Sequence, residues 1–214
     1  MIICLEGING AGKTTLAAAI ADRWRAAEGR AAAMAEPVQR TEFGRRVRTA
    51  IMSTADLDAD AEALAFASAR LHAAALLRGP EADLTILERW AGGVVAYGTV
   101  AGTSSVLLHA LETVLAAALP IDRTLLVDVP GAVAARRLAT QADANRFETN
   151  GAGYLEQVRR EYLGWARTRQ VSVISGTDSR ERLDAWAGDL VDGLRSRTCL
   201  SIDGVRCTIP GGSR

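Results

Sequence analysis

The sequence predicts an α/β fold in which a doubly wound, five-stranded parallel sheet is flanked by helices. Five short apolar runs alternate with segments of helical character, an alternation typical of parallel sheets covered on both faces. A glycine-rich loop joins the first apolar run to the first helical segment. With 214 residues, 49% of them apolar, the chain can build one sizeable core. We therefore expect one main domain, at residues 1–198, followed by a short tail.

The predicted strands are near-continuous apolar runs, which favours strands buried on both faces over strands with one face in water. They cover residues 2–5, 31–35, 84–87, 124–127 and 171–174. The segments between them show helical patterns. The predicted helices cover residues 14–28, 44–52, 59–77, 91–100, 104–119, 132–141, 154–168 and 180–194.

The tail, residues 199–214, differs from the rest of the chain. Residues 199–209 alternate in character around Asp203-Gly204, and Asp-Gly is a preferred centre of a two-residue hairpin turn. A small C-terminal β-hairpin is therefore expected. Its simplest role is to cover an apolar surface or an edge strand. A part in substrate binding or dimerisation is the alternative.

The loop GINGAGKT, residues 7–14, is the most informative motif of the chain. It matches the phosphate-binding pattern GxxxxGK[ST] and stands between a predicted strand and a predicted helix, as that pattern requires. Its backbone N–H groups and the helix N-terminus attract phosphate oxygens. Lys13 would reach the β- and γ-phosphates, and Thr14 would ligate Mg²⁺. We expect a P-loop NTPase-type fold whose nucleotide-binding residues are Gly7, Asn9, Gly10, Ala11, Gly12, Lys13, Thr14 and Thr15.

The composition favours a small-molecule partner. The 25 basic and 25 acidic residues cancel, so no general attraction to nucleic acid or to an anionic membrane is expected. Lys13 is the only lysine, every other fixed cation being arginine. The chain does not open on a charged and then apolar leader and has no run of about 18 apolar residues, so we expect a cytoplasmic protein. Cys4, Cys199 and Cys207 lack metal-ligand spacing, and we assign them no function.

Chemically active side chains also follow the later strands, at the edge of the sheet where such folds bind ligands. Glu36, Pro37 and Arg40 follow the second strand, Glu88 and Arg89 the third, and Asp128, Pro130, Arg136, Arg137 and Arg146 the fourth.

The order and spacing of five motifs resemble those of thymidylate kinases, from residue 1 to about residue 195. Residues 6–15 look like the family's EGxDGxGKST opening. Glu36-Pro37, followed by Thr41, Gly44 and Arg48, is similar to REPGGTxxGxxIR with one residue inserted. FASAR at 66–70 matches FAADR, ERW at 88–90 stands where DRY stands, and RFE at 146–148 matches the end of the lid. Only the first motif is specific by itself, but the five in this order are specific to the family.

The resemblance implies a kinase that moves the γ-phosphoryl group of ATP·Mg²⁺ onto a deoxypyrimidine nucleoside monophosphate, with dTMP as the leading candidate. It implies Thr14 and Glu88 as ligands of Mg²⁺. It also implies a lid at about residues 137–150, from which Arg137 or Arg146 closes over the phosphates. A homodimer formed through helices between the second and fourth strands is expected on the same ground.

The resemblance further implies residues that recognise the acceptor nucleoside. Phe66 would stack on the base and Arg70 would hydrogen-bond to its edge. The pattern by itself allows an ordinary helix face, with Phe66 in the core and Arg70 in solvent. Tyr97 would lie near the sugar and exclude a 2′-hydroxyl, or it is an ordinary half-buried helix tyrosine.

Arg89 would hold the acceptor's 5′-phosphate, because a guanidinium group grips phosphate bidentately. The alternative is a structural ion pair with Glu36 or Glu88. Members of the family usually carry arginine just before Glu-Pro, where this chain has Ala35. Arg40 is therefore the candidate for the missing phosphate contact.

Other departures concern the base and the lid. Asn9 replaces the usual aspartate. Gly93, Val94 and Gly98 stand where polar residues commonly read the pyrimidine, which makes a modified pyrimidine nucleotide the nearest alternative acceptor. ATQ at residues 139–141 replaces a basic stretch of the lid, so the arginines on either side would have to supply the cations that phosphoryl transfer needs. This thin lid also leaves a non-catalytic nucleotide-binding protein as an alternative.

Two features are similar to deoxynucleoside kinases instead. EPV at 36–38 and ER at 88–89 stand where that family has related motifs. In that interpretation Glu36 would be the general base that deprotonates a nucleoside 5′-hydroxyl, which a monophosphate acceptor does not need. Gly10, where that family usually has alanine, and the motif at 66–70 argue against it.

Overall fold

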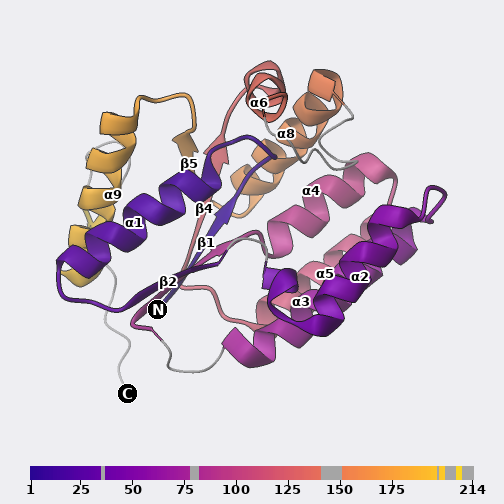
Figure 1. The fold of residues 1–214 in the computed structure, drawn as a ribbon, viewed down its shortest axis with the longest axis horizontal. Coiled ribbons are helices and arrows are strands. Elements are labelled where there is room, and N and C mark those ends of the chain that lie inside the picture. The colour runs from indigo at the N-terminus through magenta and orange to yellow at the C-terminus, as the bar shows by residue number, and fades with distance from the viewer. Residues whose placement is uncertain (35–36, 78–81, 141–150, 197, 201–205, 209–214) are drawn as a thin grey trace.

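The computed structural model describes residues 1–34, 37–77, 82–140, 151–196, 198–200 and 206–208. Its centre is a sheet of five parallel strands in the order β2-β3-β1-β4-β5 (Figure 1). The strands are β1 (Ile2–Glu6), β2 (Ala31–Met34), β3 (Leu84–Glu88), β4 (Arg123–Asp128) and β5 (Ser172–Ser175). This architecture confirms the predicted α/β fold with a five-stranded parallel sheet.

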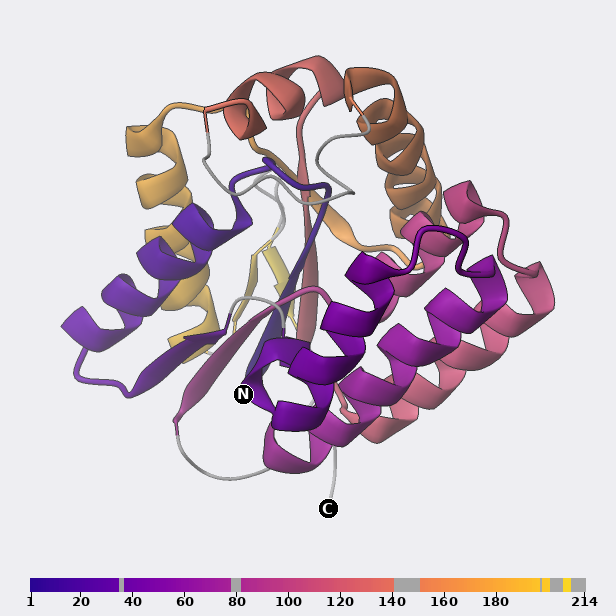
Figure 2. The same cartoon turned by 45° about the vertical axis from the view of Figure 1, so that its right-hand side comes forward.

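Helices cover both faces of this sheet. Two of them pack against each other on one side, α1 (Lys13–Ala26) and α9 (Arg180–Arg195). Figure 2 shows a second group on the other side, made of α2 (Glu42–Ser53), α3 (Ala59–Leu77), α4 (Ala91–Ala101) and α5 (Ser105–Ala118). The last pair is α6 (Gly131–Leu138) and α8 (Gly151–Thr168), and α8 also packs on α4.

The central strand, β1, places the loop that follows it between two other strand ends. Leu5 of β1 is opposite Glu88 of β3, and Glu6 is opposite Leu126 of β4. Because the three strands are parallel, the segments that leave their carboxyl ends meet at one edge of the sheet. That edge therefore brings together the glycine-rich loop, the residues after β3 and the residues after β4.

Alternate residues of β1 belong to two different apolar cores. Ile3 and Leu5 are buried in a core that includes Ile20 of α1, whereas Cys4 belongs to a second core with Trp90 and the helices α3 to α5. Burial on both faces explains why this strand is a continuous apolar run in the sequence. It also explains why Cys4 behaves as a small hydrophobic residue.

Element boundaries differ from the predicted ones where the backbone turns. The predicted helix 14–28 ends at Ala26, because Glu28 has a left-handed φ of 62°. The predicted helix 132–141 ends at Leu138 and is followed by a turn. A short 3₁₀ helix, η1 (Pro37–Arg40), precedes α2 and was not predicted.

Helix α8 is tied to the end of β4 and to the start of α6. The guanidinium of Arg159 donates to both carboxylate oxygens of Asp128, at 2.6 and 2.8 Å, and to Glu156 at 2.9 Å. The hydrogen bonds to Asp128 raise the pKa of Arg159. Glu156 in turn accepts from the backbone N–H of Gly131 at 2.8 Å, so its carboxylate caps the N-terminus of α6.

Replacing Glu156 by alanine is expected to lower the free energy of unfolding by about 1 kcal/mol at pH 7, the usual size of a lost helix cap. The hydrogen bond from Gly131, and then the interaction with Arg159, lower the pKa of Glu156. A carboxylate with a lowered pKa stabilises the fold above the ordinary glutamate value of about 4.3, and this contribution disappears as the pH falls through the lowered pKa. Urea unfolding at several pH values measures this, with Glu156→Gln as the control that keeps an acceptor oxygen. A difference between wild type and Glu156→Ala that stays constant down to about pH 3 would contradict the prediction.

The C-terminal strands β6 (Thr198–Leu200) and β7 (Arg206–Thr208) form a separate antiparallel pair. The expected Asp-Gly turn between them, at 203–204, lies outside the described residues, so the hairpin and its role stay a prediction. None of the helices that the structure describes combines the length and the apolar character that a membrane span needs.

Candidate active site

A cavity of about 550 Å³ lies where the carboxyl ends of the strands meet the helices. Its walls come from the glycine-rich loop, the end of β3, one side of α3 and α4, and the segments near α6 and α9. The predicted site residues that line it are Asn9, Gly10, Gly12, Lys13, Thr14, Thr15, Phe66, Arg70, Glu88, Arg89, Tyr97 and Arg137. Residues far apart in the sequence, from Asn9 to Leu183, thus line the same cavity.

The glycine-rich loop lies tightly against β4 and α6. Gly7 has φ 138°, and a Cβ there would lie 2.4 Å from the carbonyl oxygen of Val127. Gly10 has φ 76°, and a Cβ there would lie 2.7 Å from the carbonyl oxygen of Ala134. Both contacts are too short for a side chain, so the loop backbone packs directly against β4 and α6. The glycine at position 10, which separates this chain from the alanine usual in deoxynucleoside kinases, is therefore required by its packing.

The side chain of Lys13 folds back into the glycine-rich loop that precedes it. Its ammonium group donates to the carbonyl oxygens of Gly7 and Ile8, at 3.1 and 2.9 Å, and the residue is only 6% exposed. A cation held at the curve of a loop of backbone N–H groups is the arrangement that binds a nucleotide polyphosphate. The residues present therefore fit the triphosphate of ATP.

Thr14 and Glu88 bring two oxygen ligands together. The hydroxyl of Thr14 donates to the carboxylate of Glu88 at 3.0 Å, and both residues line the cavity. In the described part of the chain no group of three or more His, Cys, Asp or Glu side chains could hold a metal ion. Mg²⁺ usually takes one or two protein oxygens and completes its shell with water and phosphate. The pair fits that ion.

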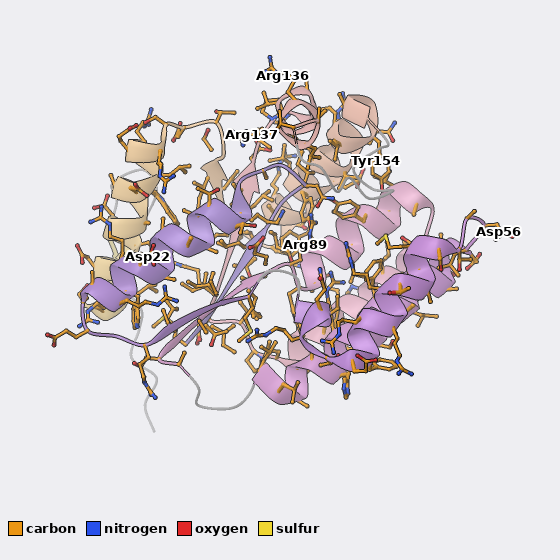
Figure 3. The ribbon with its side chains drawn as sticks, viewed as in Figure 1. Asp22, Asp56, Arg89, Arg136, Arg137 and Tyr154 are labelled. Atoms are coloured by element: carbon orange, nitrogen blue, oxygen red, sulfur yellow. The ribbon has the colours of Figure 1, made fainter. Side chains whose placement is uncertain are left out.

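Arg89 lines the cavity, and Figure 3 shows it between the end of the sheet and α4. Its guanidinium donates to the side-chain oxygen of Asn9 and to the hydroxyl of Tyr162, at 3.3 Å for the latter. It also lies over the ring of Tyr97, 5.0 Å from the ring centre. Glu88, one alternative partner considered for Arg89, instead accepts from Thr14. Arg89 has a left-handed φ of 70°, a conformation that is uncommon for a bulky residue and occurs often at functional sites.

Glu6 and Tyr162 stand behind Arg89 and were not predicted as site residues. Glu6 is 1% exposed and accepts from the backbone N–H of Trp90 at 2.7 Å and from the hydroxyl of Tyr162 at 3.1 Å. Its position in the opening motif was the only signal in the sequence. Tyr162 gives no local signal, because it reaches the site from α8, 73 residues after Arg89.

The side of the cavity formed by α3 and α4 carries the residues expected to recognise the acceptor. Phe66 is half-buried and lines the cavity, and the guanidinium of Arg70 lies 5.7 Å from its ring centre. Arg70 is 4% exposed, so the alternative of a solvated arginine is wrong. Gly93 is close to it, since a Cβ there would lie 3.7 Å from Arg70 and 3.3 Å from the hydroxyl of Tyr162. Tyr97 is half-buried, and its hydroxyl accepts from the backbone N–H of Asn9 at 3.3 Å.

Some predicted residues lie elsewhere. Arg40 is exposed at the end of η1 and does not line the cavity, which in this region is lined by Gln39 and Arg48. The 3₁₀ turn, which the sequence did not predict, sets which of these side chains faces the cavity. Glu36 and Arg146 lie outside the described residues, as does most of the expected lid.

Arg137 lies beside the glycine-rich loop. Its guanidinium donates to the carbonyl oxygens of Gly10, Ala11 and Gly176, at 3.1, 3.4 and 2.9 Å. It thus joins α6 to the loop and to the residue after β5. Figure 3 shows its neighbour Arg136 on the outer side of α6.

Comparison with known proteins gives one consistent result. A family model described as "Thymidylate kinase" matches residues 5–185. A thymidylate kinase of Cupriavidus pinatubonensis is 35% identical over 192 residues, which are 85% of this chain and 92% of that protein. Thymidylate kinases of Chromobacterium violaceum and Ralstonia nicotianae are 35% and 36% identical over 75% of this chain, and cover 78% and 82% of those proteins.

Proposed function

The chain belongs to the thymidylate kinase family, and from this premise we propose that it transfers the γ-phosphoryl group of ATP to dTMP, forming dTDP and ADP. The observation that carries the proposal is one cavity bounded by Lys13, by the Thr14–Glu88 pair and by Arg89. Lys13 suits the polyphosphate, the Thr14–Glu88 pair suits Mg²⁺ and Arg89 suits an acceptor phosphate. Phosphoryl transfer from one phosphate to another needs these three groups to face the same cavity.

The donor side of the cavity is the glycine-rich loop with Lys13. The loop N–H groups bind the β-phosphate, and the ammonium of Lys13 leaves the carbonyl oxygens of Gly7 and Ile8 to contact the transferring phosphoryl group. Thr14 and Glu88 would hold Mg²⁺, which would supply positive charge to offset the charge of the phosphates. Arg137 holds the loop and the end of β5 together beside the nucleotide.

The acceptor side is formed by α3, α4 and Arg89. Phe66 stacks on the thymine ring, Arg70 donates to its edge, and Tyr97 lies against the sugar. Arg89 grips the 5′-phosphate and orients one of its oxygens toward the γ-phosphorus. The arginine thus contributes by orientation and charge, as phosphoryl transfer requires little covalent work from the protein.

Three assignments depend on residues that the structure does not describe or places elsewhere. The lid at about 137–150, with Arg146, is proposed to close over the phosphates and to exclude water, which limits hydrolysis of ATP. Glu36 is proposed as an acceptor-site residue on the strength of its motif. The missing arginine before Glu36 is better replaced by Arg48 than by Arg40, because Arg48 lines the cavity.

A coupled assay of ADP release tests the function. ATP·Mg²⁺ is offered with each deoxynucleoside monophosphate, with 5-substituted dUMP analogues and with the matching nucleosides. We expect turnover on dTMP well above that on the other natural monophosphates. Turnover only on nucleosides would overturn the proposal and make Glu36 the general base, and preference for a 5-substituted analogue would place the modified-pyrimidine alternative first. No ADP release with any acceptor would support a non-catalytic nucleotide-binding protein.

We also propose a homodimer formed through α2, α3 and α5. Helix α3 packs on both α2 and α5, and all three helices carry exposed apolar side chains. The exposed residues are Phe43, Leu64, Leu71, Leu76, Val106 and Val114. Light scattering is expected to give twice the mass of 22.6 kDa, and Leu64→Arg is expected to give the monomer. A monomeric wild type would contradict the proposal. The cytoplasmic location stays a prediction from the sequence, to be tested by cell fractionation.

A further inference from the structure

Two buried side chains behind Arg89, Glu6 and Tyr162, take no direct part in the transfer proposed above. Both are 1% exposed, and neither is among the residues that line the cavity. Burying a carboxylate and a phenolic hydroxyl is costly unless each is hydrogen-bonded. Their contacts therefore indicate what they hold in place.

The hydrogen bonds of the Tyr162 hydroxyl have only one possible direction. A guanidinium group can donate but cannot accept, so the hydroxyl accepts from Arg89 at 3.3 Å. Its own proton is then directed at the carboxylate of Glu6, 3.1 Å away. Burial, and next the charge of Glu6, raise the pKa of Tyr162, so the hydroxyl keeps this proton at neutral pH.

Glu6 is itself fixed by the sheet. It ends β1, and its other carboxylate oxygen accepts from the backbone N–H of Trp90 at 2.7 Å. Trp90 directly follows Arg89, so the carboxylate holds the backbone next to the arginine while Tyr162 holds its guanidinium. Asn9 and the ring of Tyr97 contact the guanidinium as well. A side chain held on several sides loses little further freedom when it binds its ligand.

From these contacts we infer that Tyr162 is a positioning residue, whose hydroxyl, anchored on Glu6, holds the guanidinium of Arg89 in the orientation that binds the 5′-phosphate of the acceptor. The inference rests on the proposed function, because it needs Arg89 to bind that phosphate. It adds that α8, through Tyr162, sets the affinity for the acceptor phosphate without contacting it. The same helix holds Asp128 and the start of α6 through Arg159 and Glu156.

The test is the affinity of Tyr162→Phe for dTMP and for thymidine, measured by titration calorimetry. The variant keeps the ring and removes only the hydroxyl. We expect its dissociation constant for dTMP to rise about tenfold, the change that corresponds to about 1.4 kcal/mol, and that for thymidine, which has no phosphate, to stay within about twofold. In steady-state kinetics the KM for dTMP should rise while the KM for ATP stays unchanged. Thr168→Val is the control, because it removes a hydroxyl from the same helix where it bonds only to the helix carbonyl of Trp165.

A double-mutant cycle separates positioning from general loosening of the fold. In an Arg89→Ala background the additional Tyr162→Phe change is expected to cause no further loss of dTMP affinity, since it acts through the arginine. Equal losses for dTMP and thymidine, or an undiminished effect without Arg89, would overturn the inference. If instead the wild type bound dTMP no more tightly than thymidine, the result would contradict the proposed binding of the 5′-phosphate by Arg89, whatever the role of Tyr162. Thermal unfolding of each variant confirms that folded protein is compared.

Discussion

Lys13→Ala is expected to lower kcat for transfer to dTMP by about a thousandfold, the upper range for removing one preorganised group that stabilises transition-state charge. The ammonium is already held at the curve of the loop, at 3.1 and 2.9 Å from two carbonyl oxygens. We expect it to reach the transferring phosphoryl group by a change of its side-chain rotamer. No other lysine exists in the chain to replace it.

The ADP-release assay measures this loss, and ATP-dependent thermal stabilisation shows whether the variant still binds nucleotide. Arg136→Ala is the matched control, because it removes a cation from the outer side of α6 and should leave kcat within about twofold (Figure 3). A Lys13→Ala enzyme that retains a tenth of wild-type activity would contradict the assigned role.

The single lysine allows a second, independent measurement. An amine-directed reagent can modify only Lys13 and the N-terminal amine. ATP is expected to slow modification of Lys13 and to leave the N-terminus, which lies at the other end of β1, unaffected. Equal rates at Lys13 with and without ATP would show that the nucleotide does not contact this side chain.

Arg89→Ala is expected to lower kcat/KM for dTMP by about 10²–10⁴-fold, since two hydrogen bonds to a charged phosphate, each of about 1.5–3 kcal/mol, are lost. The fold should change little, because the hydroxyl of Tyr162 still donates to Glu6 after the arginine is removed. Alanine at this position would have to adopt the same left-handed φ of 70° as arginine, so the backbone strain is not changed by the substitution. The cost should therefore appear in acceptor binding and orientation.

Arg89→Lys is the informative comparison for this site. Lysine keeps the charge but has no planar pair of N–H donors, so it should recover only part of the lost activity. Steady-state kinetics with dTMP varied at saturating ATP, and then with ATP varied, locate the defect. If the KM for ATP rises as much as that for dTMP, the arginine would belong to the donor side and the acceptor assignment would be wrong.

Local patterns in the sequence were sufficient for the strands and for the main helices. The predicted helix 59–77 has the same limits in the structure, because its alanine-rich pattern is helical throughout. The predicted helix ends were wrong where one backbone angle stops the helix, as at Glu28. The order of the strands is a property of long-range pairing, and no local pattern in β1 says that β3 and β4, rather than β2, are its neighbours.

In the candidate site, the sequence identified the residues that belong to recognisable motifs. Lys13 and Thr14 follow the loop after β1, Glu88 ends β3 and Arg89 comes next, and they meet because parallel strands end at one edge. Arg40 was the wrong choice among the polar residues after β2, because the sequence does not show the 3₁₀ turn that leaves it exposed. Glu36 and Arg146 stay predictions.

The sequence by itself determined that this protein has a nucleotide-binding P-loop, because phosphate binding depends on a short continuous segment whose glycines and lysine have few other uses. Its kinase activity was implied by the resemblance of five motifs to those of thymidylate kinases. Only the tertiary structure decided how Arg89 is held. Asn9 and Tyr162 contact it from 80 and 73 residues away in the sequence, and Glu6, at the end of β1, holds the hydroxyl of Tyr162. A single tyrosine on an apolar helix face looks the same in sequence whether its hydroxyl meets water or a buried carboxylate. The role of Tyr162 depends on the packing that brings α8 to the end of β1.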